Sequence, residues 1–259
     1  MSILVVRINR YFLRRTVHKA VAQQQKVGPE SQLLGRTWAS LMADPLFRFR
    51  LRCLLWTDDA RFNAEALRFL IEACPKLFNS IHISAPQHFI DELKKNAPFV
   101  AVQLHDGAPN LTKLLVDHQR PLSRVVKDTD KYLTKLQAAG LDTSYVHLIE
   151  DNIKSLSRLR EAVHRKHVIC CAIDYEKDVS GRRAYISPAI FKFAQKLRLP
   201  VIFTKHDIDP QGCAQIWTSP PVMVSDPIQS AIDFQTFYNS IPGKKANLSI
   251  KRFVPRLSR

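Results

Sequence analysis

The residue with the clearest capacity for chemistry is His105, which follows an apolar run over residues 99–104. A histidine titrates near neutral pH, so it can take a proton from an attacking hydroxyl or amine. Asn110 lies five residues further on, and its amide could orient the imidazole ring through a hydrogen bond. Asp106 is a second candidate partner, although adjacent side chains on an extended chain point apart unless the turn at Gly107 brings them together. A structural histidine that caps the next helix is an equal alternative.

A second candidate group is the polar segment 174–188, which follows another apolar run and carries Asp174, Arg182 and Arg183. Guanidinium groups form paired hydrogen bonds with phosphates and carboxylates, so the two arginines are candidate substrate-binding residues. The alternative is a solvated surface loop, which is the more common role of a charged segment.

A third candidate group follows the apolar run 201–204 and contains His206, Asp207 and Asp209. These residue types can ligate metals, but the same spacing is common in loops, so no metal site is predicted. The sequence has no nucleophile elbow, Walker loop or dinucleotide-binding glycine motif.

These candidates stand at the ends of predicted strands that alternate with predicted helices. An α/β fold is therefore expected, with a mostly parallel central sheet flanked by helices. The carboxyl ends of parallel strands meet at one edge of a sheet, so His105, Asp174 and His206 are expected along that edge. The predicted strands cover residues 99–104, 122–127, 144–149, 167–173, 201–204 and 213–218. The predicted helices cover residues 59–74, 86–95, 109–118, 128–139, 151–165, 187–198 and 226–240.

The first 58 residues differ from the rest because they are basic and amphipathic. We predict a helical extension over residues 1–58 and one compact α/β domain over residues 59–259. A helix with this pattern can lie in a membrane interface or can dock on its own domain, and the sequence favours neither. The first predicted helix carries the basic residues Arg7, Arg10 and Arg14 beside the apolar residues Leu4, Ile8, Tyr11 and Phe12.

Composition limits the partners and the compartment. The formal net charge is +16, which fits nucleic acid, an anionic membrane surface or an acidic protein as partner. The five cysteines are scattered without a Cys-x-x-Cys pair, which favours a reducing compartment. No apolar segment approaches the ~18 residues of a membrane-spanning helix. The expected location is the cytoplasm, either free or peripheral on the cytoplasmic face of the inner membrane.

The order of these motifs resembles the lysophospholipid-acyltransferase superfamily, in particular the bacterial lipid A late acyltransferases. The resemblance covers about residues 95–253 by pattern. It comprises the strand that ends at His105, the later strand that ends at Asp174, and Ser187-Pro-Ala189 before a helix. It also includes the segments Lys196-Leu-Arg-Leu-Pro-Val-Ile-Phe203 and Gly212-Cys-Ala-Gln-Ile-Trp217.

The resemblance implies a glycerol-phosphate-acyltransferase-like architecture and an acyltransferase in which His105 is the general base. In that family an acid stands where this sequence has Asn110, and Tyr-Arg-Pro stands where it has the segment around Lys127. The acyl donor would be a thioester of acyl carrier protein or coenzyme A, a co-substrate, with no further cofactor. The acceptor would be a hydroxyl or an amine. The candidate substrate-binding residues in this sequence are Lys127, Asp174, Arg182, Arg183 and His206.

Two other functions remain open. Asn110 at the acid position is compatible with a catalytically inactive relative that binds lipid, a carrier protein or a partner enzyme. The basic charge alone would suit nucleic acid, but no recognition helix or stacked aromatic motif supports specific nucleic-acid binding.

Overall fold

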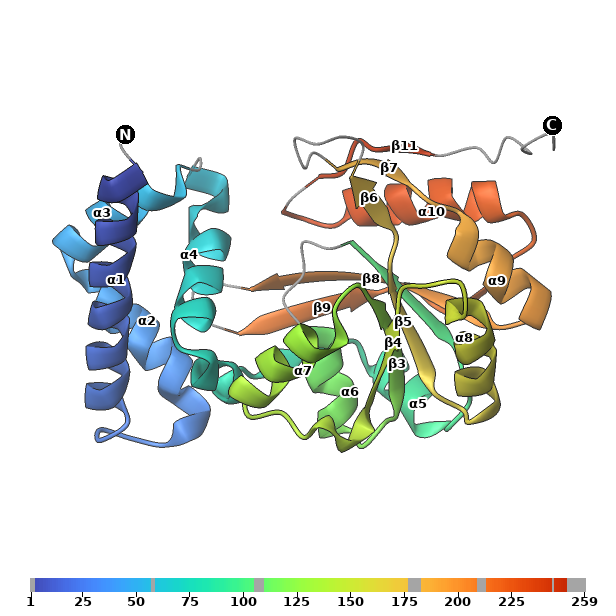
Figure 1. Cartoon of the computed structure of the whole chain (residues 1–259), viewed down its shortest axis with the longest axis horizontal. Coiled ribbons are helices and arrows are strands. Elements are labelled where there is room, and N and C mark those ends of the chain that lie inside the picture. The colour runs from blue at the N-terminus through green and yellow to red at the C-terminus, as the bar shows by residue number, and fades with distance from the viewer. Residues whose placement is uncertain are drawn as a thin grey trace. The chain divides into compact units, whose positions relative to one another are not determined.

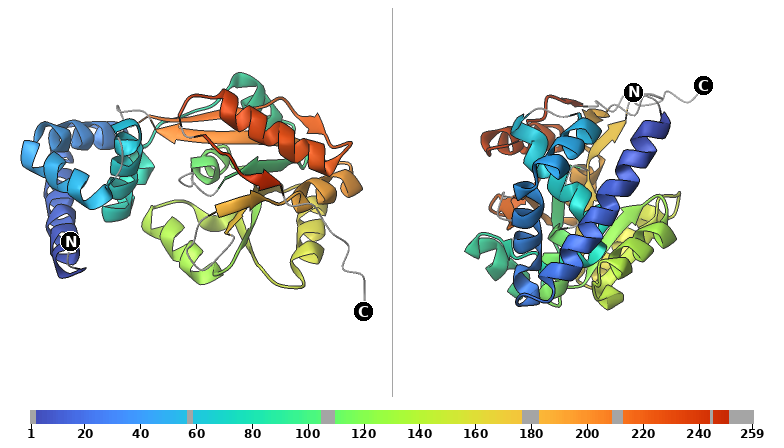
Figure 2. Two further views of the ribbon diagram at one scale, coloured as in Figure 1. Left: turned by 90° about the horizontal axis from the view of Figure 1, so that it is seen from above. Right: turned by 90° about the vertical axis from the view of Figure 1, so that its left-hand side faces the viewer.

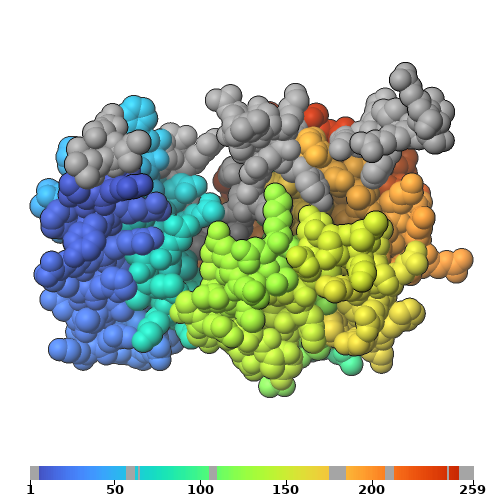
Figure 3. Space-filling view, viewed as in Figure 1, coloured from blue at the N-terminus to red at the C-terminus, as the bar shows by residue number. Residues whose placement is uncertain are grey.

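The chain forms two compact units, seen in the computed structural model of Figures 1 and 3. The structure describes residues 3–56, 59–104, 110–176, 183–208, 213–243 and 245–250. The first unit, called the helical unit here, comprises Met1–Ser84, Asp130–Thr143 and His206–Gln215. The second, called the sheet unit, comprises Ala85–Thr129, Ser144–Lys205 and Ile216–Arg259. The predicted domain boundary at residue 58 stays a prediction.

The helical unit is built mainly from α-helices joined by short turns. Asp44 begins α3 because its carboxylate accepts hydrogen bonds from the backbone of Leu46 and Phe47. Trp56 ends the same helix in the left-handed conformation. The helices are α1 (Ile3–Gln24), α2 (Leu33–Ala43), α3 (Pro45–Leu55), α4 (Asp59–Ala73) and α7 (Thr129–Ala138), with the 3-10 turns η1 (Glu30–Gln32) and η2 (Pro75–Ser80). A third 3-10 turn, η3 (Thr143–Tyr145), lies where the chain leaves this unit.

Helix α1 docks on its own unit and also keeps an exposed apolar face. It packs against α2, α3 and α4, and it forms much of the surface of this unit in Figure 3 (dark blue). The buried face consists of Leu13, Val17, Ala20 and Val21. The predicted membrane-facing residues Ile8, Tyr11 and Phe12 are between 47% and 62% exposed. No helix among the described residues is both long enough and apolar enough to cross a membrane.

The sheet unit contains a mostly parallel sheet with strand order β9-β8-β2-β5-β3-β4, which confirms the predicted fold class. All pairings among β2, β3, β4, β5 and β8 are parallel. The short strand β10 (Val222–Met223) runs antiparallel to β8, and in the helical unit β1 (Ile83–Ser84) pairs parallel with the start of β9. The long strands are β2 (Val100–Gln103), β3 (Leu122–Val126), β4 (Val146–Glu150), β5 (Val168–Ala172), β8 (Pro200–Ile208) and β9 (Ala214–Thr218).

Helices cover both faces of this sheet (Figures 1 and 2). Alternate strand residues such as Val100 and Val102 join one core cluster with α8, α9 and α10. On the opposite face, Phe89 of α5 packs edge to face on Phe99, with ring centroids 6.0 Å apart. The helices of this unit are α5 (Gln87–Lys94), α6 (Asn110–Asp117), α8 (Ser155–His164), α9 (Ala189–Leu197) and α10 (Pro227–Ser240).

The predicted polar loop 174–188 is wrong in part, because both of its ends are strands. β6 (Asp174–Glu176) pairs antiparallel with β7 (Arg183–Ile186), and β7 pairs parallel with β11 (Ser249–Ile250). Pairing with distant residues thus gives strand structure to a charged segment. Ile186 is fully buried in the main core cluster, which fixes this small sheet to the rest of the unit.

The strand predicted over residues 201–204 is also longer than expected. β8 continues to Ile208, so Lys205, His206 and Asp207 lie within the strand and do not follow it. Helix α2 lies within the helical extension predicted over residues 1–58, although no separate helix was predicted at these residues.

Candidate functional site

The C-terminal end of β2 is the centre of the candidate site, because β2 lies between β5 and β8 in the middle of the sheet. Its last residue, Gln103, stands opposite Ala172 of β5. On the other side, Val102 stands opposite Phe203 of β8, which places Thr204 next to Gln103. All three strands run in the same direction. Ligands of open parallel sheets bind at this edge, beyond the carboxyl ends of the strands.

Polar side chains are buried around this strand end, which is unusual for the middle of a sheet. Gln103 is 2% exposed, and Asn110 and Thr112 at the start of α6 are each 1% exposed. Gln103 Oε1, both amide atoms of Asn110 and the hydroxyl of Thr112 have no hydrogen-bond partner within the described parts of the chain. A buried polar atom without a partner costs about 1–3 kcal/mol, and such groups are rare in folded proteins. These atoms therefore mark a site where a partner is expected.

Asn110 is the most informative of these residues. It is the first residue of α6, and its side chain has two donors and an acceptor that no described residue uses. Helix α6 is buried from Asn110 to Val116, so the amide is not solvated by bulk water. The side chain can hold a histidine ring, a substrate or a backbone group of the preceding turn.

Three predicted site residues, His105, Asp106 and Arg182, lie outside the described residues. For Arg183 only the backbone is described, and it pairs with Glu176 across β6 and β7. Their proposed roles stay predictions.

Asp174 follows the end of β5 by two positions and is 3% exposed. The preceding residue, Ile173, donates its backbone N–H to Gln103 O at 3.1 Å, so the backbone of Asp174 lies near the end of β2 in space. A buried carboxylate at this edge suits the predicted binding role, although it begins β6 and does not open a loop.

Lys127 and His206 are placed differently from Asp174. Lys127 follows the end of β3 and is exposed, with β5 between its strand and β2. His206 lies in the part of β8 that belongs to the helical unit, whereas Asn110, Lys127 and Asp174 belong to the sheet unit. The structure thus groups three of the predicted residues in one unit.

Lys205 lies near this edge but has a structural role. It is 2% exposed, and its ammonium group donates to Tyr238 O at 3.0 Å and Ile241 O at 3.1 Å. The same group lies 4.3 Å from the centre of the Tyr238 ring. A cation at the end of α10 satisfies the last carbonyl groups of the helix.

The described residues do not favour a metal or a thiol at this site. They include no group of three His, Cys, Asp or Glu side chains that could hold a metal ion. The neighbouring residues Cys170 and Cys171 of β5 have pKa values of about 12, raised by burial. These thiols therefore stay protonated and unreactive at neutral pH.

Sequence patterns alone missed Gln103 and Thr112. Both are polar residues inside apolar elements, and that contrast is the signal that could have identified them. Whether they lack partners depends on the packing of α6 and could not be seen in the sequence.

No protein-family profile and no curated protein sequence matches this chain. Among solved structures, the chain is similar to the crystal structure of the 1-acyl-sn-glycerophosphate (LPA) acyltransferase PlsC from Thermotoga maritima. The two share 11% sequence identity with a TM-score of 0.43, over 81% of this chain and 93% of that chain.

Proposed function

We propose that this protein transfers an acyl group from a thioester to a hydroxyl or amine acceptor, with His105 as the general base. The observation that carries the proposal is the buried amide of Asn110, which no described residue satisfies. Asn110 stands five residues after His105, at the helix start that follows the central strand. The motif order of the sequence supports the same chemistry.

The reaction requires only one proton carrier. His105 takes the proton of the acceptor as its oxygen or nitrogen attacks the thioester carbonyl carbon. The C–O or C–N bond forms, the C–S bond breaks, and the imidazolium returns the proton to the leaving thiolate. Asn110 accepts a hydrogen bond from the second ring nitrogen and so orients the ring. An amide stabilises the imidazolium less than a carboxylate does, which suits an amine acceptor because an amine needs less help from a base.

The net charge of +16 suits the proposed donors. Acyl carrier protein is strongly acidic and coenzyme A carries phosphates, so either donor would be attracted over long range. The attraction should weaken as salt is added.

The proposal is tested by incubating the protein with acyl thioesters and candidate acceptors and measuring the products by intact mass. His105→Ala should lower the rate about 10²- to 10⁴-fold, the usual contribution of a general base. His164→Ala, at the exposed end of α8, is the matched control and should keep the rate. Full activity of folded His105→Ala, or no turnover of any thioester by the natural sequence, would reject the proposal in favour of an inactive binding protein.

A second variant tests the partner position. Asn110→Asp restores an acid at the spacing that the resemblance implies. We expect it to raise the rate with hydroxyl acceptors more than with amine acceptors, because a carboxylate strengthens the base. Equal changes for both acceptors would contradict the role of Asn110 in holding His105.

We also propose that the helical unit binds an anionic membrane surface. Apolar side chains on α1 and α3 are exposed side by side: Phe12 is 47%, Leu46 57% and Phe49 66% exposed. The two helices pack on each other, and Asn9 donates to Arg50 O at 3.1 Å. The two helices also carry exposed arginines, among them Arg7, Arg14, Arg48 and Arg50. Exposed apolar side chains together with arginines are typical of helices that lie in the interface of an anionic bilayer.

Vesicle sedimentation tests this surface. The protein should bind vesicles that contain phosphatidylglycerol and should not bind pure phosphatidylcholine. Phe49→Ser should weaken binding, whereas Val27→Ser, at an exposed apolar residue beyond α1, should not. Equal vesicle binding by the two variants would reject the proposal that this surface binds a membrane.

A further inference from the structure

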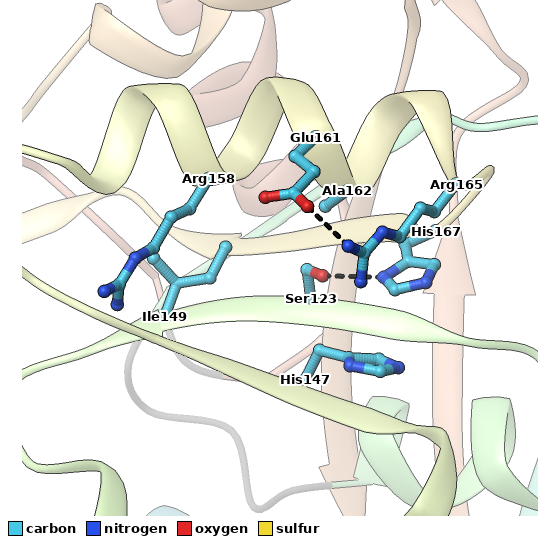
Figure 4. A pocket seen from close by; sticks show the side chains of 8 residues that line it. All are labelled: Ser123, His147, Ile149, Arg158, Glu161, Ala162, Arg165 and His167. Atoms are coloured by element: carbon cyan, nitrogen blue, oxygen red, sulfur yellow. Dashed lines mark hydrogen bonds and ion pairs between the residues drawn. The ribbon is translucent and has the colours of Figure 1, made fainter.

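A polar pocket of about 210 Å³ lies at the other end of the sheet, away from the proposed acyl-transfer site (Figure 4). Its strand residues lie where strands begin: Ser123 and His147 are the second residues of β3 and β4, and His167 precedes β5. Helix α8 forms the opposite wall with Arg158 and Glu161, together with Arg165 directly after the helix. Ile149 and Ala162 add a small apolar area.

The histidines of this pocket are held in fixed positions. The ring of His167 is hydrogen-bonded through Nδ1 to Ser123 Oγ at 2.9 Å. The ring of His147 stacks on it, with centroids 4.3 Å apart and planes 28° apart. This stack is possible because β3, β4 and β5 are in parallel register, with Ser123 opposite both His147 and Ile169. The imidazoles are therefore preorganised and do not need to be ordered by a ligand.

The arginines give the pocket an excess of positive charge. Arg165 forms an ion pair with Glu161 one turn earlier on α8. Arg158 also lines the pocket, and the described residues offer it no acidic partner. Arg165 and Glu161 lie beside the two imidazoles, whereas Arg158 lines the pocket from beside Ile149, where its donors are open to a ligand (Figure 4).

We propose that this pocket binds a small oxyanion of the phosphate type, held by Arg158 and Arg165 and by the imidazoles of His147 and His167. Guanidinium groups match the oxygen geometry of phosphate and form paired, charge-assisted hydrogen bonds with it. The apolar side chains of Ile149 and Ala162 leave space for a short organic group attached to the anion. The described residues include no group of three His, Cys, Asp or Glu side chains that could hold a metal ion, so we do not propose a metal site here.

The electrostatics of the histidines support this assignment. Burial lowers the pKa of His167 to about 4, and the charges of His147, Arg165 and Arg120 lower it further in the same direction. Burial and Arg165 likewise lower the pKa of His147. Arg158 and Glu161 on α8 and the hydroxyl of Ser123 on β3 complete the groups that line the pocket around the rings. A bound anion would offset the arginine charges and favour the imidazolium, so binding should take up protons.

Calorimetric titration with inorganic phosphate tests the site directly. Arg158→Gln should weaken binding about five- to tenfold, the effect of losing one charged donor. Arg160→Gln, on α8 and outside the pocket lining, is the matched control and should bind like the natural sequence. Both positions are exposed, so neither change should affect folding. Equal affinities of the two variants, or no measurable binding at millimolar phosphate, would overturn the proposal.

The pH dependence gives a second readout. Affinity should rise as the pH falls toward about 4, the pKa of His167 in the ligand-free protein, because the bound state holds the imidazolium more readily. His167→Asn keeps a side-chain oxygen near Ser123 and should remove most of this proton uptake. Unchanged proton uptake in His167→Asn would contradict the role of the ring.

The ligand class is resolved by comparing phenyl phosphate with benzoate. Tighter binding of phenyl phosphate than of both inorganic phosphate and benzoate supports a phosphate ester in the pocket. Tighter binding of benzoate would overturn the choice of phosphate chemistry. His105→Ala should leave all these affinities unchanged, so the pocket and the proposed acyl transfer can fail independently.

Discussion

The two ends of the parallel sheet differ in whether their buried polar groups have hydrogen-bond partners. At the carboxyl end of β2, Gln103, Asn110 and Thr112 keep polar atoms that no described residue binds. At the amino ends of β3, β4 and β5, the buried hydroxyl of Ser123 binds His167, and the exposed side chains of Arg165 and Glu161 form an ion pair. The first end has unmet hydrogen-bonding capacity inside the fold, whereas the second has a mostly satisfied, solvent-open pocket.

The difference indicates different uses. Unsatisfied buried groups lower stability, so they persist where function needs them. A satisfied set of imidazoles and arginines costs little and can bind a charged ligand without rearrangement. The carboxyl end therefore suits catalysis and the amino end suits anion binding, on one sheet.

The largest expected effect comes from removing a buried polar group that has hydrogen-bond partners. Lys205 is such a group. Lys205→Ala removes two hydrogen bonds from a charged donor and leaves a cavity beside Tyr238. We expect the free energy of unfolding to fall by about 3–5 kcal/mol. Urea denaturation measures it, with Lys154→Ala at the exposed start of α8 as control. If Lys205→Ala and the control lose a similar amount of unfolding free energy, the hydrogen bonds of this buried group do not stabilise the fold.

The next effect is a pH dependence of stability at the amino end. The pKa of His167 is about 4 in the folded chain and about 6.5 when unfolded. Between these values the unfolded state binds a proton that the folded state does not, so stability falls as the pH falls from 6.5 to 4. The loss approaches about 3 kcal/mol. It should be largely absent in His167→Asn, and an equal pH dependence in that variant would place the titrating group elsewhere.

The sequence predicted most of the main sheet because its strands are buried on both faces. The apolar runs of β2, β5 and the first half of β8 predict buried strands even when the strands they pair with are not known. The second half of β8 and most of β6 are polar, so their structure depends on pairing with neighbouring strands. A local pattern cannot report such pairing.

The candidate site was predictable only where spacing along the chain was enough. Asn110 was chosen because it stands five residues after His105, and the structure finds it buried at a helix start. The stacked pair His147 and His167 could not be predicted, because their contact depends on the register of three strands. Neither histidine has a local sequence signal that separates it from a core residue.

A smaller effect is expected when one hydrogen bond of the amino-end pocket is removed. Ser123→Ala deletes the hydroxyl that binds His167 Nδ1, and it should cost about 1 kcal/mol of unfolding free energy. Chemical denaturation at pH 7 measures the change. A value near zero would mean that water replaces the hydroxyl, and the contrast between the two ends would be weaker than the structure indicates.

The smallest expected effect on stability is at the carboxyl end, where the same kind of change should cost almost nothing. Thr112→Val replaces a buried hydroxyl, for which no partner exists among the described residues, with a methyl group of similar size. Asn110→Leu removes two unsatisfied amide atoms in the same way. We expect stability within about 0.5 kcal/mol of the natural sequence, or a small gain, because a desolvated polar group is lost.

Asn110→Leu should nevertheless lower the proposed acyl transfer strongly, since the proposed partner of His105 is lost. This separation of stability from activity is the sharpest form of the comparison. If Asn110→Leu instead destabilised the fold by about 2 kcal/mol or more, its amide would be bound to the preceding turn in the resting protein. Asn110 would then be a structural helix cap, and the carboxyl end would be no less satisfied than the amino end. Thr112→Val separates these cases from a general intolerance of α6, because it changes the same buried helix without touching the proposed partner of His105.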